Sequence, residues 1–160
     1  MKRRVVDTNV LIVANGRNTN ASDGCREATI DGLKSIIDHA RIIIDAAGEI
    51  IEEYRRHCFH AGQPGLGDEF FRLVLVNYQG KIERVDVPKN EDGSFVNFPI
   101  DARLNAFDYS DRKFAATAKA SGARIVNSTD SDWIDHCYAL TENGIEIEFL
   151  CGADRASWFK

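Results

Sequence analysis

The chain has 160 residues, of which 44% are hydrophobic and 28% charged, so it can bury the core of one domain and is not a disordered tail. It has 20 Lys and Arg against 25 Asp and Glu, and the resulting net charge of −5 excludes nucleic-acid binding by bulk positive charge alone. A carboxylate cluster that binds metal would add to this negative total and would still attract phosphate once it holds cations.

Cysteines and targeting signals give little information. The apolar run after the basic N-terminus is interrupted at Asp7, and no stretch approaches the roughly 18 apolar residues of a membrane span. We therefore expect no membrane association, and a reducing cytoplasm as the default compartment. The cysteines form no CxxC pair, and we expect all of them to be reduced thiols: Cys25, Cys58, Cys137 and Cys151.

The first 60 residues predict two units of a strand followed by helix. A short apolar run ends at Val6, residues 8–14 continue as a short helix, and residues 16–20 are a polar loop. Ser22 or Asp23 can cap a second helix that runs to about His39. Residues 41–45 (RIIID) are typical of a buried parallel strand, and residues 46–59 have the periodicity of a helix.

The remaining residues continue this alternation. Residues 62–65 are a loop, residues 68–78 an amphipathic helix, and residues 81–87 a strand. Two of the three prolines fall in residues 88–99, which predicts a long loop that extends to about residue 106. A helix from residue 110 or 111 to 122, a strand at 124–127, a helix at 131–142 and a last strand at 145–150 complete the chain.

Strands that alternate with helix-sized segments predict an α/β fold, in which helices cover both faces of a parallel sheet. The chain contains no repeat or linker, so we expect one domain of residues 1–160. The functional crevice of such a sheet lies at the carboxyl ends of its strands. The residues that directly follow each strand are therefore the candidates for chemistry.

Acidic side chains occupy several of these positions. Carboxylates that meet in one pocket repel one another unless a cation neutralises them. Oxygen ligands suit Mg²⁺ or Mn²⁺, and two such ions about 3.5–4 Å apart can promote phosphodiester hydrolysis. The pattern therefore indicates metal-dependent cleavage of a nucleic-acid backbone. The acids at or near the strand ends are Asp7, Glu49, Glu52, Glu53, Asp111, Asp130 and Asp132.

The same residues give the chain a resemblance to a known family. The segments VVDTNVL (residues 5–11), DRKFA (111–115) and IVNSTDSDW (125–133), with a helical Glu after the second strand, resemble the PIN domain. The match spans nearly the whole chain in the family's order. It implies a three-layer α/β/α sandwich with a central parallel sheet, and a Mg²⁺- or Mn²⁺-dependent nuclease that most often acts on RNA.

The resemblance also assigns roles to single residues. Glu53 is favoured as the second acid because Tyr54 follows it, and Glu49 on the same helix face is the next choice; Glu52 points elsewhere. Asn9 and Ser128 match residues that orient the site and its ligands. The catalytic acids are expected to be Asp7, Glu53, Asp111 and Asp130, and the metal ligands Asp7, Asp111, Asp130 and Asp132.

Substrate and partner assignments are less specific. Arg112, Lys113 and Arg56 lie near the predicted rim, where they either hold backbone phosphates or are ordinary solvated cations. Phe95, Phe98 and Phe107 either stack on exposed bases or, as we favour, pack the long loop onto the domain. The resemblance implies an RNA substrate, with DNA left open, and an antitoxin protein and a homodimer as partners; toxin, housekeeping and defence roles all remain open.

Two other functional classes compete with a nuclease. Each acid alone has an ordinary explanation as a helix cap, a turn residue or part of a solvated helix face. A catalytically inactive PIN-like module that binds RNA or protein would have lost two or more acids, whereas all four positions are filled here. An aspartyl phosphatase needs a second proton-transferring acid two residues after Asp7, and Asn9 stands there instead.

Overall fold

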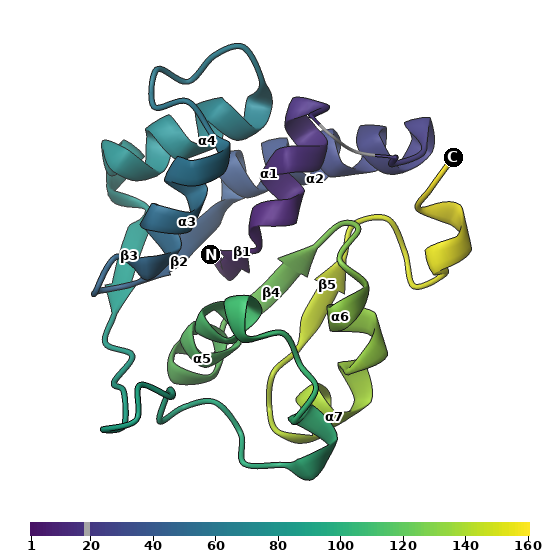
Figure 1. Ribbon diagram of the computed structural model, residues 1–160. Coiled ribbons are helices and arrows are strands. Elements are labelled where there is room, and N and C mark those ends of the chain that lie inside the picture. Colours follow the sequence, from purple (N-terminus) through teal and green to yellow (C-terminus); the bar gives the residue numbers. More distant parts are fainter. Residues whose placement is uncertain (18–19) are drawn as a thin grey trace.

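The computed structural model describes residues 1–17 and 20–160, and within them a five-stranded, all-parallel sheet lies at the centre of the molecule (Figure 1). The strand order is β3-β2-β1-β4-β5. The order reverses direction between β1 and β4, and such a switch point is where ligands bind in open α/β sheets. The strands are β1 (Lys2–Val6), β2 (Ala40–Asp45), β3 (Ile82–Val85), β4 (Arg124–Asn127) and β5 (Ile147–Phe149).

Helices cover both faces of this sheet, with α1–α4 on one side and α5–α7 on the other (Figure 1). This arrangement confirms the predicted α/β fold and the three layers that the PIN resemblance implies. The helices are α1 (Thr8–Asn15), α2 (Asp23–His39), α3 (Glu49–His57), α4 (Leu66–Leu75), α5 (Arg112–Ser121), α6 (Ser131–Asp135) and α7 (Cys137–Glu142).

The core forms where apolar strand residues meet the inner faces of the helices. In β2, Ile42, Ile43 and Ile44 are all buried, because helices cover the sheet on both sides. Tyr54 of α3 is also fully buried, and its hydroxyl donates a hydrogen bond to the Val6 carbonyl at the end of β1, at 2.5 Å. The helix that carries Glu53 is thereby attached to the strand that ends at the candidate site.

The structure fixes the start of the first strand, for which the sequence predicted only an end, and moves several other boundaries. β1 begins at Lys2, because Lys2–Arg4 continue the parallel pairing with β2. α4 ends at Leu75, and Asn77 just beyond it takes a left-handed conformation (φ 50°) that does not continue a helix. The helix predicted at 131–142 divides at His136 into α6 and α7. Residues 18–19, in the predicted polar loop at 16–20, lie outside the described residues.

The expectation of four reduced cysteines is wrong for one pair. Cys25 in the first turn of α2 and Cys151 just after β5 form a disulfide, with Cα atoms 4.9 Å apart. The fold brings these ends together across 126 residues, a proximity that no local spacing reveals. Cys58 and Cys137 are free. Disulfides are typical of oxidising surroundings, so the reducing cytoplasm stays a prediction. Among the described residues, no helix has the length and apolar content needed to cross a bilayer.

Candidate metal centre

Three acids from separate parts of the chain meet at the switch point of the sheet. Asp7 follows β1, Asp111 lies at the start of α5, and Asp130 follows β4 and caps α6. One carboxylate oxygen of each lies within 4.8 Å of the others. Asp7 and Asp111 are buried, with 2% and 7% of their surface exposed, and Asp130 is half-buried. The structure therefore brings together three of the four acids predicted to be catalytic.

The carboxylate of Asp7 is held in a fixed orientation. Its Oδ1 accepts a hydrogen bond from the Thr8 backbone N–H at 2.9 Å, so it also caps α1. Its Oδ2 accepts hydrogen bonds from the indole N–H of Trp133, at 2.8 Å, and from the Asn9 side chain. Trp133 is fully buried on α6, which means that the first turn of α1 and helix α6 together fix the Asp7 carboxylate.

Asn9, in the first turn of α1, directly contacts the residues that follow β4. Its Oδ1 accepts the backbone N–H groups of Ser128 and Thr129, at 2.9 and 3.0 Å, while its Nδ2 donates to Asp7 and, at 2.9 Å, to Asn127 Oδ1. The side chain of Asn9 therefore fixes the chain after β4 relative to the end of β1. This geometry agrees with the orienting role that the resemblance implies for it.

Burial and mutual repulsion make these acids reluctant to ionise. Burial and the negative charge of Asp130 raise the pKa of Asp7 to about 7, although the Trp133 hydrogen bond opposes the shift. Burial and the charges of Asp7 and Asp130 raise the pKa of Asp111 to about 10. Burial also raises the pKa of Asp130, which shares a hydrogen bond with Asp111. The surrounding groups therefore do not compensate the negative charge that this cluster would carry if all three acids were ionised.

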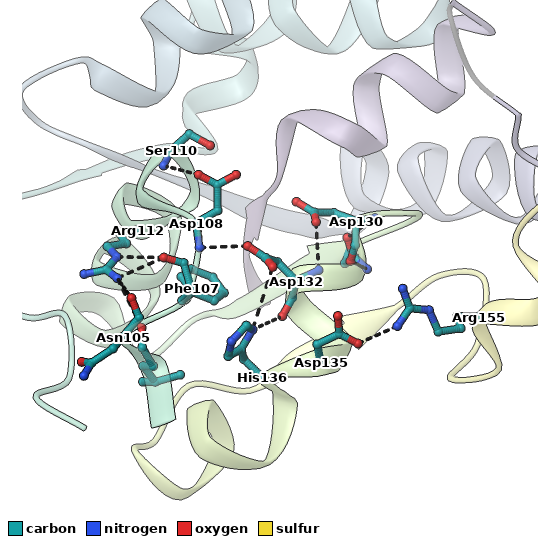
Figure 2. Close-up of polar contacts among 12 residues, drawn as sticks. Asn105, Phe107, Asp108, Ser110, Arg112, Asp130, Asp132, Asp135, His136 and Arg155 are labelled. Atoms are coloured by element: carbon teal, nitrogen blue, oxygen red, sulfur yellow. Dashed lines mark hydrogen bonds and ion pairs between the residues drawn. The ribbon is translucent and has the colours of Figure 1, made fainter. Parts of the chain in front are cut away.

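A second cluster adjoins the first through Asp111. Oxygens of Asp108, Asp111 and Asp132 also lie within 4.8 Å of one another. Figure 2 shows Asp108 beside Asp132, whose Oδ2 accepts the Asp108 backbone N–H at 2.9 Å; His136 lies on the other side of Asp132. Sequence reasoning missed Asp108, and its position one turn before Asp111 was the available signal. Asp132 was predicted as a metal ligand, and the structure places it in this second cluster.

Glu53 lies next to these clusters but not within them. Asp45, at the end of β2, caps α3 by accepting the N–H groups of its first residues, and this capped helix carries Glu53 one turn later. Glu53 accepts a hydrogen bond from the Thr8 hydroxyl and forms an ion pair with Lys113 at 2.7 Å, largely shielded from solvent. The charge of Glu53, next to Asp7, is therefore balanced by that of Lys113.

Glu49 belongs to neither acid cluster. Its side chain is half-buried and pairs with Lys89 of the long loop, at 2.8 Å. It begins α3, and its backbone N–H donates to Asp45. The structure therefore gives Glu49 a surface ion pair in place of the supporting position that was predicted for it.

Three other predicted residues have partners within the protein, and a fourth is exposed. The hydroxyl of Ser128 lies 2.8 Å from that of Thr29 in α2 and is not directed to an acid. Arg112 donates to the backbone carbonyls of Leu104, Asn105 and Phe107, as Figure 2 shows in part, so it stabilises the long loop. Lys113 forms an ion pair with Glu53, and Arg56 is an exposed residue of α3.

The donor set fits a hard divalent cation. All side chains of the two clusters offer carboxylate oxygens, and no Lys or Arg contributes an ion pair to the three acids of the first cluster among the described residues. A cation of the Mg²⁺ or Mn²⁺ type would remove the repulsion that raises their pKa values. Zinc would favour nitrogen and sulfur ligands, which the clusters lack.

Comparison with known proteins found a similar solved structure. No family model matches the chain, and no curated protein matches it. Among solved structures, the crystal structure of VapBC2 from Rickettsia felis bound to a DNA fragment from their promoter is similar over 92% of this chain and 98% of that chain. The sequence identity is 12% and the TM-score 0.45. The sheet and helices of this chain themselves show the α/β/α architecture, and three of its own acids meet at the switch point of that sheet.

Proposed function

We propose that this protein is a divalent-metal-dependent nuclease that hydrolyses phosphodiester bonds of RNA. The observation that carries the proposal is the convergence of Asp7, Asp111 and Asp130, whose oxygens lie within 4.8 Å of one another at the switch point of a parallel sheet. Buried acids without compensating cations destabilise a fold, and such strain is typical of sites that bind a cation or substrate.

The residues of the chain divide the work of such a site. Asp7, Asp111 and Asp130 would hold Mg²⁺ or Mn²⁺, and Asp108 and Asp132 lie where they would hold a second ion through their contact with Asp111. Bound cations of this kind polarise a phosphate and stabilise the charge that develops on the departing oxygen. Asn9 and Trp133 keep the Asp7 carboxylate oriented, and so act as positioning residues.

Glu53 and Lys113 complete this site in the proposal. Their ion pair lies beside Asp7, because Glu53 also accepts a hydrogen bond from the hydroxyl of Thr8, the residue next to Asp7 in the chain. The pair lies at the edge of the acid cluster, where the lysine can attract the negatively charged backbone of a substrate. Release of Lys113 toward a phosphate would leave Glu53 free to accept a proton from the attacking water.

The direct test is cleavage of mixed RNA and DNA pools with Mg²⁺ or Mn²⁺. We expect cleavage of RNA that EDTA stops, and a loss on the order of 10³-fold in Asp130→Asn, because a ligand to the ion is removed. Asp135→Asn is the matched control: Asp135 lies on the adjoining helix α6 and pairs with Arg155 at the surface, as Figure 2 shows. The control variant should cut at the wild-type rate.

Two results would contradict the proposal. Cleavage at full rate in EDTA, or by Asp130→Asn, would show that the acids hold no essential cation. Titration calorimetry with Mn²⁺ separates a nuclease from an inactive module that only binds RNA or protein: heat of binding that disappears in Asp111→Asn supports a metal site, and no heat in the wild type contradicts it.

A further inference from the structure

A large cavity lies under the long segment that connects β3 to α5. Its volume is about 900 Å³, and its lining comes from residues 90–105 of this segment together with Tyr109 and Arg112. Cavities of roughly 300–1,000 Å³ are typical of sites for small organic groups. The predicted loop is therefore not only connecting material, because it lines an open space of ligand size.

The cavity shares a wall with the candidate metal centre. Tyr109 and Asp111 belong to one 3₁₀ turn, and Arg112 follows directly. Asp108, just before this turn, belongs to the second acid cluster, and Asp111 belongs to both clusters. A group bound in the cavity would thus be separated from the acids by a single turn of backbone.

The most exposed aromatic side chain of this wall is Tyr109, with 78% of its surface exposed. The guanidinium of Arg112 lies 4.0 Å from the centre of its ring and 4.5 Å from that of Phe98. Backbone carbonyls of Leu104 and Phe107 hold Arg112 in place. One face of Tyr109 is therefore supported by a fixed cation, and the ring is available to stack a further planar group.

Both apolar and polar groups line the rest of the cavity. Val96 and Ile100 also line it and are exposed, Ile100 fully, which is unusual for apolar side chains grouped at one site. Asn90 and Asn105 bring amide groups that can pair with the edge of a heterocycle. The lining thus offers a stacking surface together with hydrogen-bonding groups.

We propose that this cavity binds an unpaired nucleobase of the substrate strand, stacked on Tyr109, next to the phosphate that the acids would hold. The inference rests on the proposed nuclease function and names its substrate as single-stranded at this position. An occupant that engages both features must carry a planar group one backbone step from a phosphodiester. Stacking on aromatic side chains beside a phosphate-binding site is how proteins bind unpaired nucleic-acid bases.

Binding can be measured apart from cleavage with Ca²⁺ in place of Mg²⁺, since Ca²⁺ also takes oxygen ligands. The probes are oligoribonucleotides of one sequence, intact or with one abasic position moved along the strand, and their affinities are read by fluorescence anisotropy. We expect one position at which loss of the base weakens wild-type binding about 5–150-fold, the contribution of one stacked base. 2-Aminopurine at that position should lose fluorescence on binding.

Variants of Tyr109 test whether the sensitive base binds in the cavity. Tyr109→Ala should bind the intact strand as weakly as the abasic strand, whereas Tyr109→Phe, which keeps the ring, should discriminate as the wild type does. Tyr138→Ala is the matched control, because Tyr138 on α7 is similarly exposed (74%) and lies outside the cavity lining. Thermal unfolding should be the same for all three, since neither tyrosine is buried.

The outcomes separate this inference from the proposed function. If Tyr109→Ala still binds the intact strand more tightly than the abasic strand, the proposed base site is wrong. The same conclusion follows if Tyr138→Ala loses this difference in affinity as fully as Tyr109→Ala does. A wild type that cuts RNA but shows no sensitive abasic position also overturns it, while the nuclease stands. A wild type that shows the Tyr109-dependent position but never cuts with Mg²⁺ or Mn²⁺ supports the base site and contradicts the nuclease. No affinity for any strand contradicts the base site, and leaves a protein occupant for the cavity.

Discussion

Two groups of buried acids in this molecule have opposite electrostatic surroundings. Asp68, on α4, is completely buried, but Arg17 forms an ion pair with it at 2.5 Å, and the N–H groups of Phe59 and Gly65 donate to it. Burial raises the pKa of Asp68, yet these hydrogen bonds outweigh it and the pKa lies below its ordinary value. At the carboxyl edge of the sheet, burial and repulsion instead raise the pKa of Asp7 and Asp111.

The difference shows that burial alone does not distinguish a functional acid from a structural one. Asp68 organises the segment between α3 and α4, and its carboxylate accepts hydrogen bonds from the Arg17 guanidinium and from two backbone N–H groups. The edge acids face one another, and the hydrogen bonds from Asn9 and Trp133 to Asp7 fix its orientation without cancelling the repulsion. Such an arrangement is favourable only when a further positive group binds.

The largest expected effect concerns activity at the edge acids. Asp111→Asn should lower the cleavage rate on the order of 10³-fold, because the residue belongs to both acid clusters. The free energy of unfolding, measured in urea without metal, should stay the same or rise, since asparagine has no carboxyl group that must take up a proton on folding, as Asp111 with its raised pKa must. Loss of both activity and stability would show that Asp111 is structural in the manner of Asp68.

The converse effect is expected at Asp68. Asp68→Asn should lower the free energy of unfolding by about 2–4 kcal/mol, because Arg17 and two backbone N–H groups lose a charged acceptor. The rate of cleavage per folded molecule should remain close to that of the wild type. Urea unfolding followed by circular dichroism, with activity measured well below the transition, tests both parts. A folded Asp68→Asn protein that has lost activity would contradict the distinction.

The pH dependence of stability should follow the edge acids. Between about pH 5 and 7 the unfolded chain has ionised its carboxyls, whereas folded Asp7 and Asp111, with pKa values of about 7 and 10, still hold protons. The folded state binds more protons, so stability without metal should fall as pH rises, by about 1.4 kcal/mol per pH unit for each extra proton.

Variants and metal sharpen this test. Asp111→Asn should remove about one proton's share of the slope, while Asp68→Asn should keep it, because the lowered pKa of Asp68 affects stability only in acid. Mn²⁺ should flatten the slope and raise stability near pH 7, since it competes with protons for the same oxygens. A metal-free slope of zero between pH 5 and 7 would contradict the electrostatic description of the site.

Much of this contrast could be predicted from the sequence. The position of Asp7 after a strand, of Asp130 after another, and of Asp111 at a helix start placed them at one edge once the sheet was known to be parallel. The strand–helix alternation also predicted the fold, because helices on both faces make strands such as RIIID uniformly apolar. These features depend on local pattern and on general topology.

What could not be predicted depends on side-chain partners distant in sequence. The ion pair of Lys113 with Glu53 and the contact of Ser128 with Thr29 each join residues at least 60 positions apart. The cavity depends on how the segment after β3 folds over Arg112, and nothing in its periodicity specifies that. The disulfide is of the same kind, because only the closed fold brings its two cysteines together.

The smallest expected effect decides between the two candidates for the second acid. Glu49→Gln removes an ion pair with Lys89 whose side chains are both more than a third exposed, so rate and stability should stay within about twofold and about 1 kcal/mol of the wild type. Glu53→Gln leaves Lys113 without its acid beside Asp7, and should lower the cleavage rate by about 10–100-fold. Both residues lie on α3, one turn apart, and serve as controls for each other. Equal rates for the two variants would mean that α3 supplies no acid to the reaction, and that Glu53 serves only to hold Lys113 in place.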